Sequence, residues 1–338
     1  MGANTKIQWA HHSVNPWLGC TKISTECREC YAEAFARRFG VGWGKGAPRR
    51  KTTSWKADAL RWERLYLSEC EPEYPQWAGH RLTPEHPRVF GGSLMDWLDP
   101  EVPIEWLIEM LDVMSQTPNL RWLQLTKRPE LFWDRMDEAL EFVAENLAVP
   151  SGLGIHADEA ANKTFEWLAA WLDGKPPANV WFGVSAGTQS TADKFVPELL
   201  KIPAALRWVS CEPMLEKVDF TGIWAGSQED GSQCSWCGSY VDSLSLVGHD
   251  CMDPRIGVNL IVFGGESGPH ARPCNVDWIR DGLRQCREAG VPAYVKQLGA
   301  HIIGAHGNQR CRLFTHDRKG GDSAQWPEDL QVREMPGQ

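Results

Sequence analysis

Short apolar runs that end in polar residues recur along the chain, and each has the length of a buried strand. Six of these runs lie at 88–93, 121–127, 180–185, 206–212, 260–266 and 293–297, and a further strand is expected near 7–15. Apolar runs bounded by turn signals are typical of parallel strands that are covered on both faces.

Helical patterns lie between these runs, at 101–116, 191–203 and 275–290. In the last of them, Asn275 is a candidate N-cap and Gly290 a stop signal. Alternation of strand and helix predicts βα units around a mostly parallel sheet. About seven strands suit a full or partial (β/α) barrel better than a sandwich.

The carboxyl ends of the predicted strands are polar. They carry Ser93, Asp96, Thr126, Lys127, Ser185, Glu212, Glu266, Ser267, Lys296 and Gln297. This end of a barrel or open α/β sheet builds the active site. We therefore expect a polar mouth above an apolar barrel; the alternative is that strands simply end where polarity returns.

Two segments interrupt the alternation of strands and helices. Residues 40–87 and 222–258 are interpreted as insertions in a barrel that spans 1–300, and the second insertion is rich in cysteine. Residues 301–338 are interpreted as a loop-rich C-terminal cap.

The formal net charge is −9, so the chain has no overall cationic field to attract nucleic acid. Arg37–Arg38 and the run 48–51 form a local basic patch that either contacts phosphates or is a solvated surface. We find no signal peptide and no apolar run of membrane-spanning length. A soluble cytoplasmic protein without a membrane partner is expected.

Eleven cysteines without a secretion signal argue against a disulfide framework. Cys20, Cys27 and Cys30 lie within one short stretch that has no fourth local cysteine. His11 or His12 would complete a zinc site. A [4Fe–4S] cluster held by these three thiolates alone would keep one iron open for a substrate or cofactor.

A second group, Cys234, Cys237, His249 and Cys251, lies in the insertion at 222–258. Its spacing is typical of a structural Zn²⁺ site with three cysteines and one histidine. An auxiliary iron–sulfur cluster and unpaired surface cysteines are the alternatives.

The stretch "NPWLGC…CRECYAE" resembles the cluster loop of radical S-adenosylmethionine (SAM) enzymes, although three residues are inserted between the first two cysteines. Further stretches occur in the same order in a divergent phage and bacterial family known for its three-cysteine motif: "LTKRPE", "WFGVSAGTQSTAD", "VSCEPML", "GGESGPHARP" and "KGGDSAQWPEDLQVRE".

The resemblance implies a radical SAM-type barrel with a [4Fe–4S] cluster on Cys20, Cys27 and Cys30. It also implies SAM as cofactor, an external electron donor and a 5′-deoxyadenosyl radical. The phage setting of the family implies modification or rearrangement of a base in DNA or of a modified nucleoside. For a phage-encoded protein, the compartment would be the host cytoplasm.

The resemblance also suggests roles for single residues. Tyr31 matches a position near the adenine, and Ser93 stands where the family's SAM-binding acid is usual, with Asp96 as its substitute. Thr126 and Ser185 are further candidates for cofactor contacts, and Lys127 is a candidate catalytic residue.

Two carboxylates at the strand ends, Glu212 and Glu266, are candidates for ribose or substrate binding or for proton donation. The alternative for each is a buried carboxylate paired with a cation such as Lys127 or Arg128.

Two other functions compete with this interpretation. One is a non-catalytic, zinc-stabilised protein that binds DNA or another partner, with both cysteine groups as zinc sites. The other is a radical SAM DNA-repair lyase, in which Cys211 would relay the radical.

Overall fold

The computed structural model describes residues 2–3, 5–69, 85–147, 155–221, 223, 243–244, 257–304 and 317–337. Its centre is an eight-stranded sheet in the order β1-β2-β5-β6-β7-β8-β9-β11. The strands are β1 (Gly2–Ala3), β2 (His12–Val14), β5 (Arg88–Gly91), β6 (Arg121–Thr126), β7 (Val180–Ser185), β8 (Leu206–Cys211), β9 (Leu260–Gly264) and β11 (Ala293–Gln297).

Strand β1 is antiparallel to β2, and the other seven strands run parallel as a curled half-barrel. These seven strands are the ones predicted from the apolar runs. The α/β class and the partial form of the barrel are thereby confirmed.

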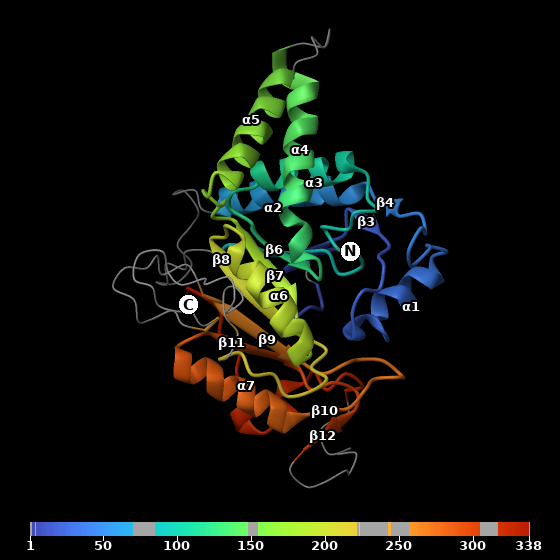
Figure 1. Cartoon of the computed structure of the whole chain (residues 1–338), viewed down its shortest axis with the longest axis vertical. Coiled ribbons are helices and arrows are strands. Elements are labelled where there is room, and N and C mark those ends of the chain that lie inside the picture. The colour runs from blue at the N-terminus through green and yellow to red at the C-terminus, as the bar shows by residue number, and fades with distance from the viewer. Residues whose placement is uncertain are drawn as a thin grey trace, which may run out of the picture.

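Seven helices accompany the described strands (Figure 1). They are α1 (Tyr31–Arg38), α2 (Ser54–Glu69), α3 (Ile104–Ser115), α4 (Phe132–Leu147), α5 (Ile155–Leu172), α6 (Gln189–Lys201) and α7 (Val276–Ala289). The three predicted helices correspond to α3, α6 and α7, and Asn275 and Gly290 cap α7 as expected. None of the helices in the described ranges is long and apolar enough to cross a membrane.

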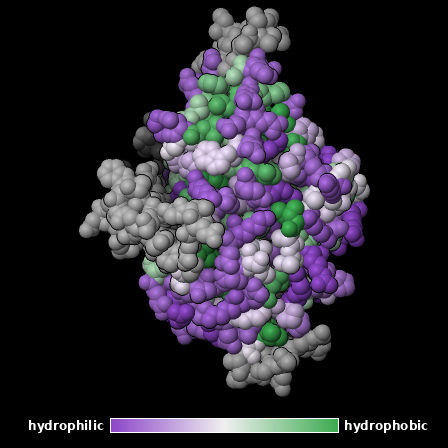
Figure 2. Space-filling model, in the orientation of Figure 1, coloured by the Kyte–Doolittle hydropathy of each residue, from purple (hydrophilic) through white to green (hydrophobic). Residues whose placement is uncertain are grey.

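Helices α4 and α5 lie side by side and project beyond the sheet at the top of Figure 1. Both fall between β6 and β7, where the sequence pattern gave no prediction. Figure 2 shows polar side chains over most of the visible face, with apolar groups among them near this helix pair.

The described residues also form two pairs of short strands and four 3₁₀ helices. Strands β3 (Trp17–Leu18) and β4 (Arg50–Lys51) pair antiparallel, and β10 (Cys274–Asn275) and β12 (Ile302–Ile303) pair parallel. Within the described residues, the 3₁₀ helices are Thr25–Cys27, Pro129–Leu131, Ser323–Gln325 and Glu328–Leu330.

The two faces of the sheet bury two separate apolar clusters, because successive side chains of a strand point to opposite faces. The larger cluster packs the outer face against the helices. The inner cluster is aromatic, and Trp9 lies 4.7 Å from Phe90 and 5.1 Å from Trp208 between ring centroids. Gly183 leaves room for the Trp208 ring, since a Cβ at position 183 would lie 2.3 Å from this ring. The apolar barrel floor is therefore filled by side chains.

The C-terminal tail covers the free edge of β11. Backbone bonds of 2.8 Å join Val295 to Val332 and of 2.9 Å join Glu334 to Ala293. The side chain of Gln8 then donates to the carbonyl of Gly321 at 2.9 Å. The tail thus links the last strand to the N-terminal segment across the open side of the half-barrel. Its backbone bonds to β11 also protect the edge of that strand, which would otherwise be unpaired.

The ring of His12 stacks on Trp62 of α2 at 4.0 Å between centroids. Burial, followed by the charges of His11 and Arg61, lowers the pKa of His12 from 6.5 to about 4. Between these two pH values the unfolded chain binds a proton that the folded chain does not, so the free energy of unfolding falls as the pH is lowered.

We expect the urea midpoint of His12→Phe, which keeps a ring against Trp62, to fall less between about pH 7 and 5 than that of the wild type. Equal falls in both proteins would contradict this assignment.

Candidate active site

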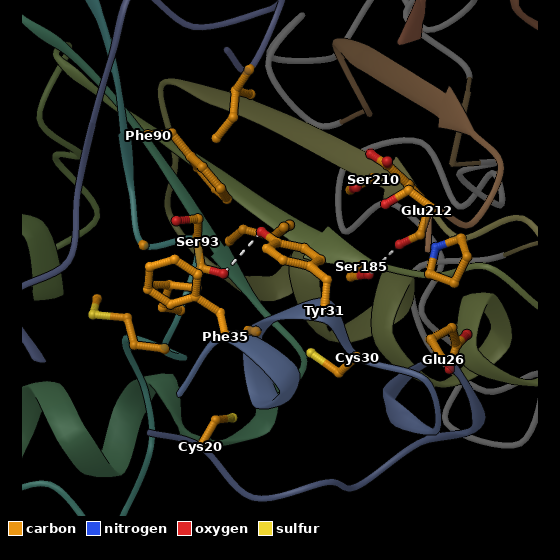
Figure 3. Close-up of a pocket in the computed structure, with 18 of the residues that line it drawn as sticks. Cys20, Glu26, Cys30, Tyr31, Phe35, Phe90, Ser93, Ser185, Ser210 and Glu212 are labelled. Carbon is orange, nitrogen blue, oxygen red and sulfur yellow. Dashed lines mark hydrogen bonds between the residues drawn. The ribbon is translucent and has the colours of Figure 1, made fainter. Parts of the chain in front are cut away.

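A cavity of about 880 Å³ opens at the carboxyl ends of the parallel strands (Figure 3). This volume is near the upper end of the usual range for small-molecule sites, roughly 300–1,000 Å³. Fourteen side chains predicted from the sequence line it: Cys20, Cys27, Cys30, Tyr31, Ser93, Asp96, Thr126, Lys127, Ser185, Glu212, Glu266, Ser267, Lys296 and Gln297. The polar mouth expected above the apolar floor is therefore present.

Asn15 fixes the start of the cysteine segment to the end of β5. Its Oδ1 accepts a hydrogen bond from the backbone of Leu94 at 2.6 Å, and its Nδ2 donates to Ser93 Oγ at 3.1 Å. The hydroxyl of Tyr31 donates to the carbonyl of Ser93 at 2.9 Å. The "NP" of the motif and the "GGS" after β5 thus form one corner of the cavity. Gly19, with a φ of +116°, makes the turn before the first cysteine.

The three cysteines are free thiols in different local settings. Burial raises the pKa of the Cys20 thiol to about 12, with the charge of Asp96 adding to the effect. Burial also disfavours the Cys27 thiolate. The charge of Lys127 and hydrogen bonds from Ser24 and the backbone outweigh that effect, so the pKa of Cys27 is lowered. Because metal ligation needs thiolates, Cys27 is the better prepared of these two.

Arg128 anchors the first cysteine. Its Nη1 lies 2.8 Å from Asp96 Oδ2 and 3.7 Å from Cys20 Sγ, and its Nη2 donates to the carbonyl of Thr21 at 2.8 Å. Asp96 also accepts bonds from the Thr126 hydroxyl at 2.7 Å and the Lys127 backbone at 3.0 Å. Both carboxylate oxygens of Asp96 thus accept protein donors, and Asp96 and Thr126 help to hold the loop; their expected contacts with SAM stay predictions.

Arg272 anchors the second cysteine region from the opposite side. It forms a two-point pair with Glu266, at 2.7 Å and 2.9 Å, and donates to the carbonyl of Thr25 at 2.7 Å. The side chain of Glu26 in turn accepts from the backbone of Gly187 at 3.0 Å, just before α6. The buried-pair alternative is therefore right for Glu266, with Arg272 as the partner in place of Lys127 or Arg128, and the pair positions the loop. The separation of six residues from Glu266 to Arg272 in "GGESGPHARP" was the available signal.

Glu212 lies at the inner end of the cavity. Both of its carboxylate oxygens are 2.9 Å from Lys296 Nζ, and Gln297 Nε2 donates to it at 3.0 Å. Ser185 donates to the backbone carbonyl of Glu212 at 3.2 Å. Lys127, which the sequence offered as a partner of this carboxylate, makes no ion pair in the part of the chain that the structure describes. The buried-pair alternative is therefore right for Glu212, with Lys296 as the partner.

Cys211 does not have the position that a radical relay needs. It is fully buried in the outer cluster between the sheet and the helices and is not among the cavity residues. Glu212, the next residue, faces the cavity, and adjacent side chains of an extended segment point to opposite faces. The proposed role of Cys211 is thus corrected.

Neither histidine of the zinc alternative lines the cavity. His11 Nδ1 accepts a hydrogen bond from the backbone of Arg88 at 2.9 Å, and His12 stacks on Trp62. The first cysteine group therefore lacks the histidine ligand that this alternative required. Cys234, Cys237, His249 and Cys251 lie outside the described residues.

The basic patch is only partly available to a ligand. Arg49 is buried in an ion pair with Asp99 at 2.8 Å and also donates to Thr21 Oγ1 at 2.8 Å. Arg50 is exposed, lines the cavity and donates to the carbonyl of Phe39 at 2.9 Å. Arg49 therefore supports the cysteine loop, and Arg50 is the residue of this run that faces the opening.

Within the described ranges, no three His, Cys, Asp or Glu side chains surround a point that would hold a single metal ion. A cubane cluster binds each thiolate through a different iron, so its ligands line one pocket without meeting at one point. Three soft thiol donors at one cavity, with no histidine among the described residues that line it, fit an iron–sulfur cluster.

Fold and site together define a class of protein, namely a parallel β/α half-barrel with three free cysteines at the mouth of its cavity. Residues 4–325 match the family model described as protein of unknown function (DUF5131), and the chain belongs to this family. No curated protein and no solved structure matches the chain.

Proposed function

We propose that this protein is a radical SAM enzyme whose active site is the cysteine-lined cavity. The observation that carries the proposal is that Cys20, Cys27 and Cys30, alone among the described cysteines, line the cavity at the carboxyl ends of the parallel strands. When bound, a reduced [4Fe–4S] cluster with one open iron supplies the electron that cleaves the sulfonium C–S bond of SAM.

The side chains around the cysteines divide the remaining tasks. Tyr31, held to Ser93 by its hydroxyl, offers a ring to the adenine. Ser185 and the Glu212–Lys296 pair present polar groups at the inner end, where a ribose or a substrate group is held. The apolar floor around Trp208 excludes water below this layer.

Anaerobic reconstitution with iron and sulfide tests the proposal. We expect about four irons per chain and, with a reductant, conversion of SAM to 5′-deoxyadenosine measured by mass spectrometry. Alanine at Cys20, Cys27 or Cys30 should abolish both. Cys286→Ala is the matched control, because Cys286 is buried on α7 away from the cavity and should leave both unchanged.

Zinc without iron at the three cysteines would support the non-catalytic alternative and overturn the proposal. The DNA-repair lyase alternative needed Cys211 as a radical relay, and the buried position of Cys211 away from the cavity does not fit that role. An intact SAM cleavage activity in the Cys30→Ala variant would equally contradict the proposed site.

A further inference from the structure

Helix α1 presents an aromatic face at the mouth of the cavity. Tyr31 and Phe35 are four residues apart in α1 and so share one side of the helix, and Phe39 is the C-cap residue that ends it. Their exposed fractions are 53, 39 and 53 %, and all three line the cavity. The rings of Phe35 and Phe39 lie 4.6 Å apart, and Figure 3 shows Phe35 beside Tyr31. Exposed aromatic side chains grouped at an opening mark a binding surface.

Among its described charged side chains, this cavity has more cations than carboxylates that lack an ion pair. Its buried carboxylates already accept protein donors, as described for Asp96, Glu212 and Glu266. Four lining cations form no ion pair within the described residues, namely Lys6, Arg50, Lys127 and Lys319. Two lining carboxylates, Glu26 and Asp317, also lack one and, in the same ranges, accept only uncharged donors. The cavity therefore favours an anionic ligand even though the whole chain carries a net charge of −9.

Arg50 joins the aromatic face to this positive charge. Its Nη1 donates to the carbonyl of Phe39 at 2.9 Å, which holds the guanidinium at the outer end of the aromatic face. Arg50 makes no ion pair with any described carboxylate, and neither does the exposed Arg38, which precedes Phe39 in the chain but is not among the residues that line the cavity. Flat rings beside free guanidinium groups offer stacking surfaces for bases and contacts for phosphates.

We infer that the mouth of the cavity binds an unpaired nucleotide of a nucleic-acid strand, with its base against Phe35 and Phe39 and its phosphates near Arg38 and Arg50. A base that enters a cavity must be turned out of a duplex or already lie in a single strand. The inference deepens the proposed function by naming its substrate class. Binding itself, however, needs neither iron nor SAM, so the two are tested separately.

The test is fluorescence anisotropy of the metal-free full chain with a labelled single-stranded DNA oligonucleotide. Phe35→Ala/Phe39→Ala should weaken binding about tenfold or more, while Trp133→Ala, an exposed aromatic on α4 outside the cavity, should not. Arg50→Gln should lower the slope of log K against log salt by about 0.7, and the exposed Arg64→Gln should leave it unchanged.

Several outcomes would overturn the inference. These are no strand binding by the wild type, equal effects of the aromatic and control variants, or a free mononucleotide binding as tightly as the strand. A dimer that dissociates in the Phe35→Ala/Phe39→Ala variant would assign the face to a second copy of the chain. Strand binding without SAM cleavage would retain this inference and reject the proposed function, and SAM cleavage without strand binding would do the reverse.

Discussion

Asp96→Ala is expected to lower the free energy of unfolding by about 3–5 kcal/mol, because it leaves the charge of Arg128 buried without its partner. The two side chains are only 6 and 5 % exposed and lie 2.8 Å apart. Asp96 also accepts bonds from Thr126 and from the Lys127 backbone, and these donors would lose their acceptor as well. Urea unfolding of the metal-free protein under reducing conditions measures the loss.

Two further variants separate the cost of a lone charge from the cost of a lost contact. Asp96→Asn/Arg128→Met removes both charges and should recover part of the stability. Asp137→Ala, an exposed acid on α4, should change the free energy of unfolding by less than about 0.5 kcal/mol. A loss below about 1 kcal/mol for Asp96→Ala would mean that water reaches Arg128 and that this anchor is weak.

Arg272→Gln is expected to shorten the retention of a reconstituted cluster by about 10- to 100-fold, the usual effect of removing a group that orients metal ligands. Arg272 joins Glu266 to the carbonyl of Thr25, two residues before Cys27, so its loss frees the segment that carries this cysteine. Iron release to a chelator, followed by the decay of cluster absorption, measures the effect.

The matched control is Arg280→Gln on α7, whose arginine pairs with Asp277 and Asp329 far along the chain from the cysteines. It should release iron at the wild-type rate. If Arg272→Gln retained iron as well as the control, the Arg272–Glu266 pair would be structural only. The urea midpoint of the metal-free variant shows how much of the effect comes from general destabilisation.

The sequence predicted the frame of the site well because strand patterns are local. Apolar runs placed all seven parallel strands, and the polar residues that follow them placed Ser185, Glu212 and Glu266 at one edge. The alternation of side chains along a strand also indicates that Cys211 faces away from the cavity, because the next residue, Glu212, faces it. The cysteine spacing identified three donors that do line one cavity, although metal binding at them stays a prediction.

Pairing between distant segments could not be predicted from local patterns. Glu212 is paired with Lys296 and not with Lys127, and the two members of this pair are 84 residues apart in the chain. Nothing in the local sequence distinguishes Arg49 from Arg50, yet Arg49 is buried against Asp99 while Arg50 lies at the opening of the cavity. Such differences depend on which side of a strand or loop meets the core.

The sequence by itself determined the order of the parallel strands, three of the seven described helices, the polar end of the barrel and the three thiols near the N-terminus. These follow from side-chain periodicity and residue chemistry, which act over a few residues. Only the tertiary structure decided which carboxylates are already paired and which cations remain free. The physical reason is that charge pairing and burial depend on the distance between segments that only folding brings together.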